Sequence, residues 1–209
     1  VSDPQGRFLP VAFDAELPAR GLFNWLAPWI SPPQPIVLPG GSIASPQMLI
    51  ERIPLFSAPS RPVPEPLAVV YAQMREIGVG RAAAWSLLAA NIDGMPAGLG
   101  MADGQGRVAV MFPYPEPPRA PLSSPPEARS DFRWLVDLTA FCTPASPTVA
   151  APDIPDLADV LGQLASPCTV IDSMSSPAVP RRLDYRVPMT AKTEGQPEAD
   201  ASWLLISTA

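Results

Sequence analysis

The sequence predicts a mainly β protein with an antiparallel, sandwich-like core, long proline-rich extended arms and one short helix. Three observations support this fold class. First, 31 of 209 residues are prolines, against a usual share of about 5%, and their mean spacing of about seven residues (209/31) is close to the length of one strand. Second, apolar and polar residues alternate in several windows between the prolines. Third, only one window combines a helical spacing with a capping residue.

Regular structure is expected in the proline-poor windows, because proline cannot donate to a sheet ladder and breaks helix interiors. The longest window starts with 67–77, which we interpret as a strand, although its apolar residues also fit one face of a helix. The glycines of Gly78-Val79-Gly80 predict a turn into a partner strand at 83–92. In the next window, Val108, Val110 and Phe112 alternate as in a half-buried strand.

Two segments alternate most clearly, and each predicts a half-buried strand. In 131–142 one face holds Phe132, Trp134, Val136, Leu138, Ala140 and Cys142. In 182–189 one face holds Leu183, Tyr185, Val187 and Met189. A weaker alternation of Trp203, Leu205 and Ser207 predicts a last strand.

The single predicted helix follows Asp153, which can cap it, with Pro155 in the first turn. Leu157, Val160, Leu161 and Leu164 then fall at helical spacing. Such a helix has about three turns and is expected to cover one end of a sheet.

Four segments read as extended chain: 28–39, 57–66, 113–126 and 143–155, which combine Pro, Ser and Ala with few charges. They are either long surface loops or arms that cross neighbouring subunits, where a pre-extended chain loses less entropy on docking. The chain thus divides into an N-terminal proline-rich arm with short strands (1–66), a β core (67–112), and a linker with further strands and the short helix that complete the core (113–209).

Composition excludes several kinds of chemistry. The chain has no histidine, which removes Ser-His-Asp and Cys-His catalysis and imidazole metal sites. Its 14 basic residues are scattered at a net charge of −6, so no basic patch for nucleic acid is expected. No apolar run reaches the roughly 20 residues of a membrane helix, and the start lacks signal-peptide features. We expect no catalytic residue, cofactor or metal.

The two cysteines, Cys142 and Cys168, are interpreted as buried small side chains, with a disulfide as the alternative. An aromatic group of Phe23, Trp25 and Trp29 is a candidate interface anchor, because buried aromatics are common hot spots. The same three residues also fit a core cluster or a carbohydrate-binding shelf.

A short motif occurs twice. Asp3-Pro4-Gln5-Gly6-Arg7 recurs as Asp103-Gly104-Gln105-Gly106-Arg107, each followed by apolar residues. We interpret both as tight structural turns in which the aspartate (Asp3, Asp103) accepts from nearby amides, the glycine (Gly6, Gly106) supplies a positive φ, and the arginine (Arg7, Arg107) opens a strand.

The segments 84–88 and 98–108, Ala-Trp-Ser-Leu-Leu and Gly-Leu-Gly-Met-Ala-Asp-Gly-Gln-Gly-Arg-Val, together resemble carboxypeptidase-regulatory-like, transthyretin-like β-sandwich repeats. This resemblance implies a transthyretin-like core in 67–112. The segments 3–11, 54–64 and 106–118 are similar to proteins encoded with phage-tail-like contractile injection systems. That likeness implies a non-enzymatic part of a particle and lends no catalytic residues.

The sequence therefore predicts a non-enzymatic structural or adaptor subunit of a large assembly, and the resemblance implies one of the phage-tail-like kind. Its expected partners are other protein subunits, in a bacterial cytoplasmic assembly or a released extracellular particle. Two alternatives stay open: a freestanding ligand-binding β-sandwich, and a hydrolase that relies on carboxylates such as Glu51, Asp93, Asp137 or Asp172.

Overall fold

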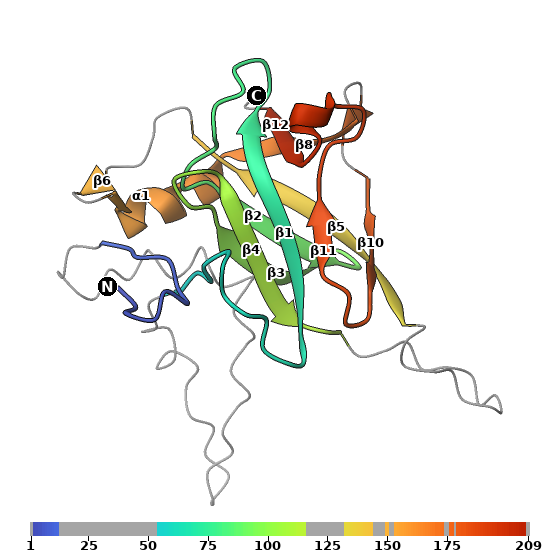
Figure 1. Cartoon of the computed structure of the whole chain (residues 1–209), viewed down its shortest axis with the longest axis horizontal. Coiled ribbons are helices and arrows are strands. Elements are labelled where there is room, and N and C mark those ends of the chain that lie inside the picture. Colours follow the sequence, from blue (N-terminus) through green and yellow to red (C-terminus); the bar gives the residue numbers. More distant parts are fainter. Residues whose placement is uncertain are drawn as a thin grey trace, which may run out of the picture.

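The computed structural model describes residues 2–12, 54–115, 132–143, 149–150, 153–173, 176–177 and 179–207. The predicted mainly β fold with one short helix is confirmed for this part of the chain (Figure 1). The strands are β1 (Leu67–Glu76), β2 (Leu87–Ile92), β3 (Met95–Met101), β4 (Arg107–Pro113), β5 (Arg133–Phe141), β6 (Val149–Ala150), β7 (Ile154–Pro155), β8 (Pro167–Ser173), β9 (Ser176–Pro177), β10 (Arg181–Asp184), β11 (Met189–Ala191) and β12 (Trp203–Ser207).

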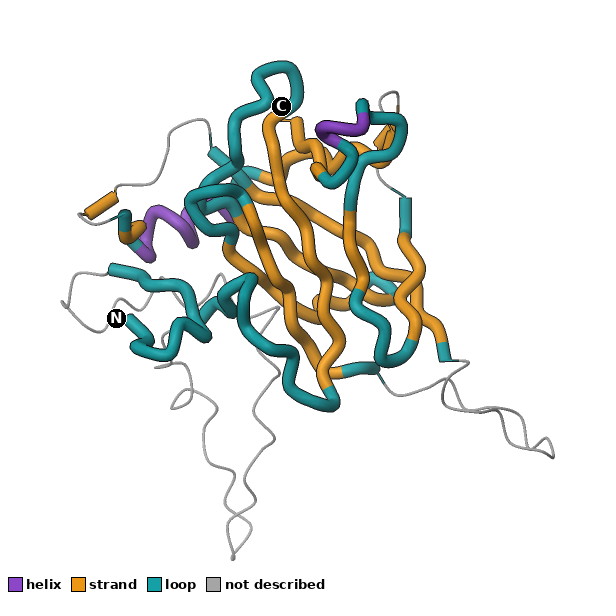
Figure 2. Tube along the Cα trace, in the orientation of Figure 1, coloured by secondary structure: helices purple, strands orange, loops and turns teal. Residues whose placement is uncertain are grey.

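The main sheet curls into two halves, traced in orange in Figure 2. In the first half, β4 pairs along β1 over Leu67–Gln73, so β11 and β12 share the other edge of β1. In the second half the order is β3-β2-β5-β10. Strand β8 joins the halves because it pairs with both β12 and β5. The ladders of β1 with β11 and β12 are parallel, so the sheet is mixed rather than purely antiparallel.

The core lies between these halves. Its largest fully buried side chains include Met74 of β1, Leu88 of β2, Phe112 of β4 and Leu204 of β12. Strands from 67–112 and from 113–209 therefore contribute to one shared core. The alternation predicted for 131–142 is confirmed: Trp134, Val136, Ala140 and Cys142 are buried, whereas Arg133 and Asp137 are exposed. The inward alternation predicted for β4 is confirmed as well.

The predicted strand 182–189 is interrupted. Strand β10 ends at Asp184, a turn follows, and β11 begins at Met189. Arg186 has a φ of 61°, a left-handed conformation that no strand contains, and it turns Val187 out to the solvent. In β12 the residues that reach the core are Leu204 and Ile206 rather than the predicted face with Trp203 and Ser207.

The predicted hairpin between 67–77 and 83–92 is wrong, although β1 and its glycine turn exist. Only Arg75 and Ala82 form a bridge after the turn, and β2 pairs with β3 and β5 in the other half. The chain crosses over at 83–86, where Trp85 has a φ of 61°. There the Ser86 hydroxyl donates to the Ala83 carbonyl at 2.6 Å.

A second apolar layer covers part of the outer face of the second half. Helix α1 (Leu157–Gly162), continued by the 3₁₀ turn Gln163–Ala165, packs with Val11 and Phe56 on Leu87 and Phe141. The cap is Asp156, whose side chain accepts from the N–H groups of Ala158 and Asp159, and not the predicted Asp153. Ile154–Pro155 is extended as β7 and so precedes the helix.

A buried hydroxyl connects the strands at the corner where β8 meets β12. Thr193 is almost fully buried. Its Oγ1 donates to the Ile171 carbonyl at 2.6 Å and accepts from the Leu205 N–H at 2.9 Å. The Thr193 side chain thereby supplies hydrogen-bond partners to one backbone group of β8 and one of β12 that are not paired in the ladder.

Cys142 and Cys168 form a disulfide, so the alternative interpretation of the two cysteines is the one observed. The bond joins the end of β5 to the start of β8, where Ala140 pairs with Cys168. It closes a loop of 26 residues at the same corner as Thr193.

The two Asp-x-Gln-Gly-Arg segments fold into the same turn. Asp3 accepts from the N–H groups of Gln5 and Arg7, and Asp103 accepts from those of Gln105 and Arg107. The bond from the Gln5 N–H lowers the pKa of Asp3. The surroundings differ: Gly106 is buried against β1, where its carbonyl accepts from the Met74 N–H at 2.7 Å, whereas a Cβ added to Gly6 would meet nothing within 4 Å.

This pair of turns gives a matched test. Gly6 and Gly106 both have positive φ, 63° and 77°, so alanine costs about 1–2 kcal/mol of conformational energy at either site. At Gly106 an added Cβ would also overlap the Met74 carbonyl, which adds about 1–3 kcal/mol. Gly106→Ala should lower the free energy of unfolding more than Gly6→Ala does, as measured by urea unfolding. Equal losses would show that the turn at 103–107 is not docked on β1.

Reduction of the disulfide should lower the free energy of unfolding by about 3 to 4 kcal/mol, because a 26-residue loop is no longer closed in the unfolded chain. Urea unfolding with and without reductant measures the difference. The Cys142→Ala, Cys168→Ala double variant is the control and should not respond to reductant. A wild-type chain that is equally insensitive would contradict the bond.

Candidate binding pocket

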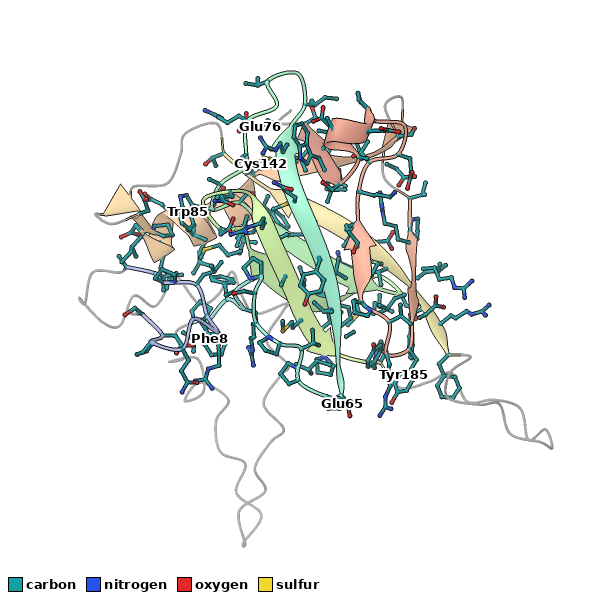
Figure 3. The ribbon with its side chains drawn as sticks, in the orientation of Figure 1. Phe8, Glu65, Glu76, Trp85, Cys142 and Tyr185 are labelled. Atoms are coloured by element: carbon teal, nitrogen blue, oxygen red, sulfur yellow. A yellow bond between two sulfur atoms is a disulfide. The ribbon has the colours of Figure 1, made fainter. Side chains whose placement is uncertain are left out.

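A hollow of about 180 Å³ lies at the end of the sandwich where β1 begins and β4 ends. Figure 3 places Glu65 and Tyr185 there, at the end opposite Cys142 and Glu76. The register sets this position: Leu67 pairs with Pro113, so Tyr114 leaves the sheet beside the segment 63–66. The lining residues are Val63, Pro64, Glu65, Pro66, Leu67, Val69, Tyr114, Tyr185, Arg186 and Pro188.

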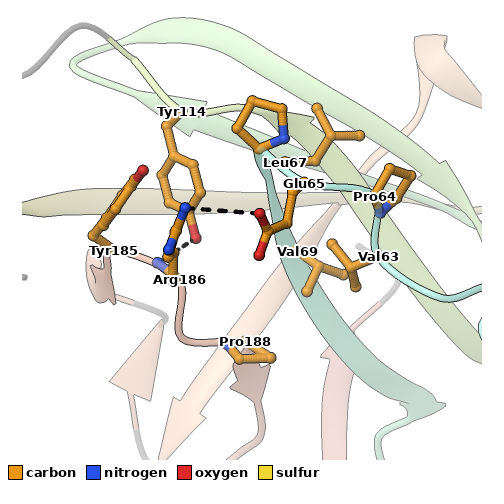
Figure 4. Close-up of a pocket in the computed structure, with 10 residues that line it drawn as sticks. Val63, Pro64, Glu65, Leu67, Val69, Tyr114, Tyr185, Arg186 and Pro188 are labelled. Atoms are coloured by element: carbon orange, nitrogen blue, oxygen red, sulfur yellow. Dashed lines mark hydrogen bonds and ion pairs between the residues drawn. The ribbon is translucent and has the colours of Figure 1, made fainter.

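One wall of the pocket is aromatic. The ring centroids of Tyr114 and Tyr185 are 4.9 Å apart, and the two rings lie side by side in Figure 4. Behind them, the ring of Trp134 lies 5.3 Å from that of Tyr114. The Tyr185 N–H donates to the Phe132 carbonyl at 3.1 Å, which holds the β10–β11 turn against the start of β5. The aromatic wall is therefore preformed.

The polar edge of the pocket is formed by Arg186 and Glu65. The Arg186 N–H donates to the Tyr114 hydroxyl oxygen at 2.8 Å. Its guanidinium lies 3.7 Å from the Glu65 carboxylate and 5.4 Å from the Tyr185 ring centre. The Arg186 and Glu65 side chains are 63% and 82% exposed, so this ion pair contributes little stability and can exchange for other partners.

Burial raises the pKa of the Tyr114 hydroxyl, and the hydrogen bond from Arg186 opposes that shift less strongly. The hydroxyl is therefore neutral over the physiological range and keeps its proton for donation. Among the described lining residues, no nucleophile is paired with a base.

Elsewhere the described carboxylates take part in local structure. Asp103 and Asp3 hold turns, and Asp172 pairs with Arg181 at 2.6 Å. Asp93 lies in the exposed β2–β3 turn and Asp137 on the outer face of β5, while Glu51 lies outside the described residues. No three acidic or cysteine side chains of the described chain are close enough to hold a metal ion. The helices in the same residues are all too short to cross a bilayer.

The predicted interface residues Phe23, Trp25 and Trp29 lie outside the described residues, as do segment 28–39 and most of 113–126. Segment 57–66 is described and contacts the N-terminal segment: the Ala58 N–H donates to the Arg7 carbonyl, and Arg61 lies 4.6 Å from the Phe8 ring centre. Sequence reasoning missed the pocket. Two residues in the sequence could have indicated it. Tyr114 lies between two prolines, and Tyr185 lies in the predicted strand 182–189.

The pH dependence of Tyr114 provides a test. Its folded-state pKa is raised, so its contribution to stability is complete below pH 10 and is lost as the pH rises through the folded value. The difference in 295 nm titration between wild type and Tyr114→Phe should have a midpoint above 10. In urea the same difference should titrate near 10, which is the control. Equal midpoints in the two conditions would contradict burial of this hydroxyl.

No protein-family model, curated protein or solved structure matches this chain. The likeness of 84–88 and 98–108 to transthyretin-like repeats and the likeness of other segments to injection-system proteins therefore stay predictions.

Proposed function

We propose that the chain is a non-enzymatic structural or adaptor subunit of a larger protein assembly, of the phage-tail-like kind that its sequence resembles. The observation that carries the proposal is the edge of the sheet at β10. Among the described strands, β10 pairs with β5 alone, so its other edge has no strand partner in the described part of the chain. Such an edge is a template for contact with another chain.

Apolar side chains surround this edge. Leu135, which pairs with Arg182 across β5 and β10, is 59% exposed. Val179 precedes β10 and Val187 follows it, and both are more than half exposed. Single exposed apolar residues are ordinary, but three around one free strand edge, next to the pocket, favour a protein partner.

A freestanding ligand-binding β-sandwich is the second candidate, and the pocket is the observation that favours it. Its volume of about 180 Å³ is below the roughly 300–1,000 Å³ of sites for drug-sized ligands. A contact with one or two residues of another protein suits this volume better than a small-molecule cofactor does.

The native size of the chain in unfractionated source lysate tests the proposal, measured by size-exclusion chromatography with an antibody. Elution at high mass that survives high salt is expected. Elution near 22 kDa would overturn the assembly and favour the freestanding binder.

A matched pair of variants tests whether the region around β10 contacts the partner protein. Leu135→Glu should release the chain from the high-mass fraction, whereas Met95→Glu should leave it there, because Met95 is 69% exposed but begins β3, on the other side of β2 from β5 and β10. Equal behaviour of the two variants would exclude the β10 edge as the contact.

A further inference from the structure

We propose that the Tyr114–Tyr185 pocket binds a polyproline II segment of a second copy of this chain, centred on Pro32-Pro33-Gln34-Pro35. This inference rests on the proposed assembly function and names the contact that builds it. The pocket and the segment are different surfaces of one chain, so their union is heterologous and propagates from copy to copy. A particle subunit needs a contact of that kind.

The shape of the pocket fits a proline-rich chain. The two tyrosine rings, 4.9 Å apart with their planes tilted by 58°, form an angled apolar wall, and Pro64, Pro66 and Pro188 form rigid borders. Aromatic-lined grooves of this kind accept polyproline II ligands because those ligands are already extended and lose little entropy on binding.

The hydrogen-bonding groups are complementary as well. A polyproline II segment has free carbonyl oxygens and few N–H groups, so its site needs donors. The Tyr114 oxygen accepts from the Arg186 N–H, which leaves its own proton to donate. Tyr185 offers a second hydroxyl on the same wall, and the exposed Arg186 guanidinium offers further donors. Among the described lining side chains, the only carboxylate acceptor is Glu65, which Arg186 partly neutralises.

The sequence supplies a ligand of matching chemistry. Pro32-Pro33-Gln34-Pro35 has the P-x-x-P spacing, and the whole segment 28–39 carries no charge, as suits a pocket whose two charges cancel. P-x-x-P spacing also occurs at 59–62, 115–118, 118–121, 144–147, 152–155 and 177–180. Four of these contain a charged residue (Arg61, Glu116, Arg119 or Asp153), and 115–118 directly follows the pocket residue Tyr114. The segment 28–39 lies in the longest uncharged stretch of the chain, from Gly21 to Ile50, so its charge matches the pocket best.

A peptide of residues 28–39, labelled at its N-terminus, tests the contact with the full chain by fluorescence anisotropy. The same peptide with Ala at positions 32, 33 and 35 should bind about tenfold more weakly, and so should the native peptide to Tyr185→Ala. Tyr185→Phe keeps the ring and removes only the hydroxyl, and should weaken binding about fivefold. Tyr71→Ala, on β1 outside the pocket, should bind like wild type. Near-UV circular dichroism confirms that each variant is folded.

Three outcomes would overturn the inference. The first is no binding to any form of the chain; the second is equal binding to Tyr185→Ala and Tyr71→Ala. The third is binding only to a chain whose own 28–39 is replaced by a Gly/Ser linker, which would assign the segment to its own pocket. High native mass together with any of these results leaves the proposed assembly intact and removes only this contact. Elution near 22 kDa removes the assembly itself, whatever the peptide does.

Discussion

The two edges of β1 determine how the rest of the chain is arranged. One edge is taken by β4, so the last strands of the chain, β11 and β12, must come back to the other edge. That return brings β12 to β8 and β8 to β5, and so closes the corner that holds Thr193 and the disulfide. Because side chains alternate along a strand, a slip of one residue in β1 would turn Val70 and Met74 out of the core.

Ion pairs contribute less to this arrangement than the ladders and the apolar core. The arginines at positions 7, 81, 107 and 182 pair with carboxylates two to five residues away, and each is more than half exposed. Surface pairs of this kind are worth little. They shape turns and strand ends locally, while long-range order comes from residues such as Phe112 and Leu204 that are fully buried.

The sequence was informative where one local pattern decides the structure. Alternation in 131–142 predicted β5 and its buried face, and the capping signals predicted a helix within three residues of its true cap. Prediction failed where contacts between segments far apart in the sequence determine the structure. The partner of β1 is β4 rather than β2, because a left-handed residue at Trp85 redirects the chain. The pocket joins Tyr114 to Arg186, 72 residues apart, and no local spacing encodes that contact. The disulfide likewise depends on register, not on the interval between its cysteines.

The connections made by β8 also determine how the two halves of the sheet respond to a separating force. Along one side of the sandwich, β8 bridges the two halves at one end. It is held to β12 by a short ladder, and to β5 by a short ladder and the disulfide between Cys142 and Cys168. At the other end of that side, β10 and β11 are joined through the turn 185–188, with no ladder between them among the described strands. A force that separates the halves is therefore resisted by the β8–β12 ladder at one end and by the contact of Tyr114 with Trp134 at the other. The disulfide keeps β8 attached to β5, so the halves would separate between β8 and β12 and leave the covalent bond intact.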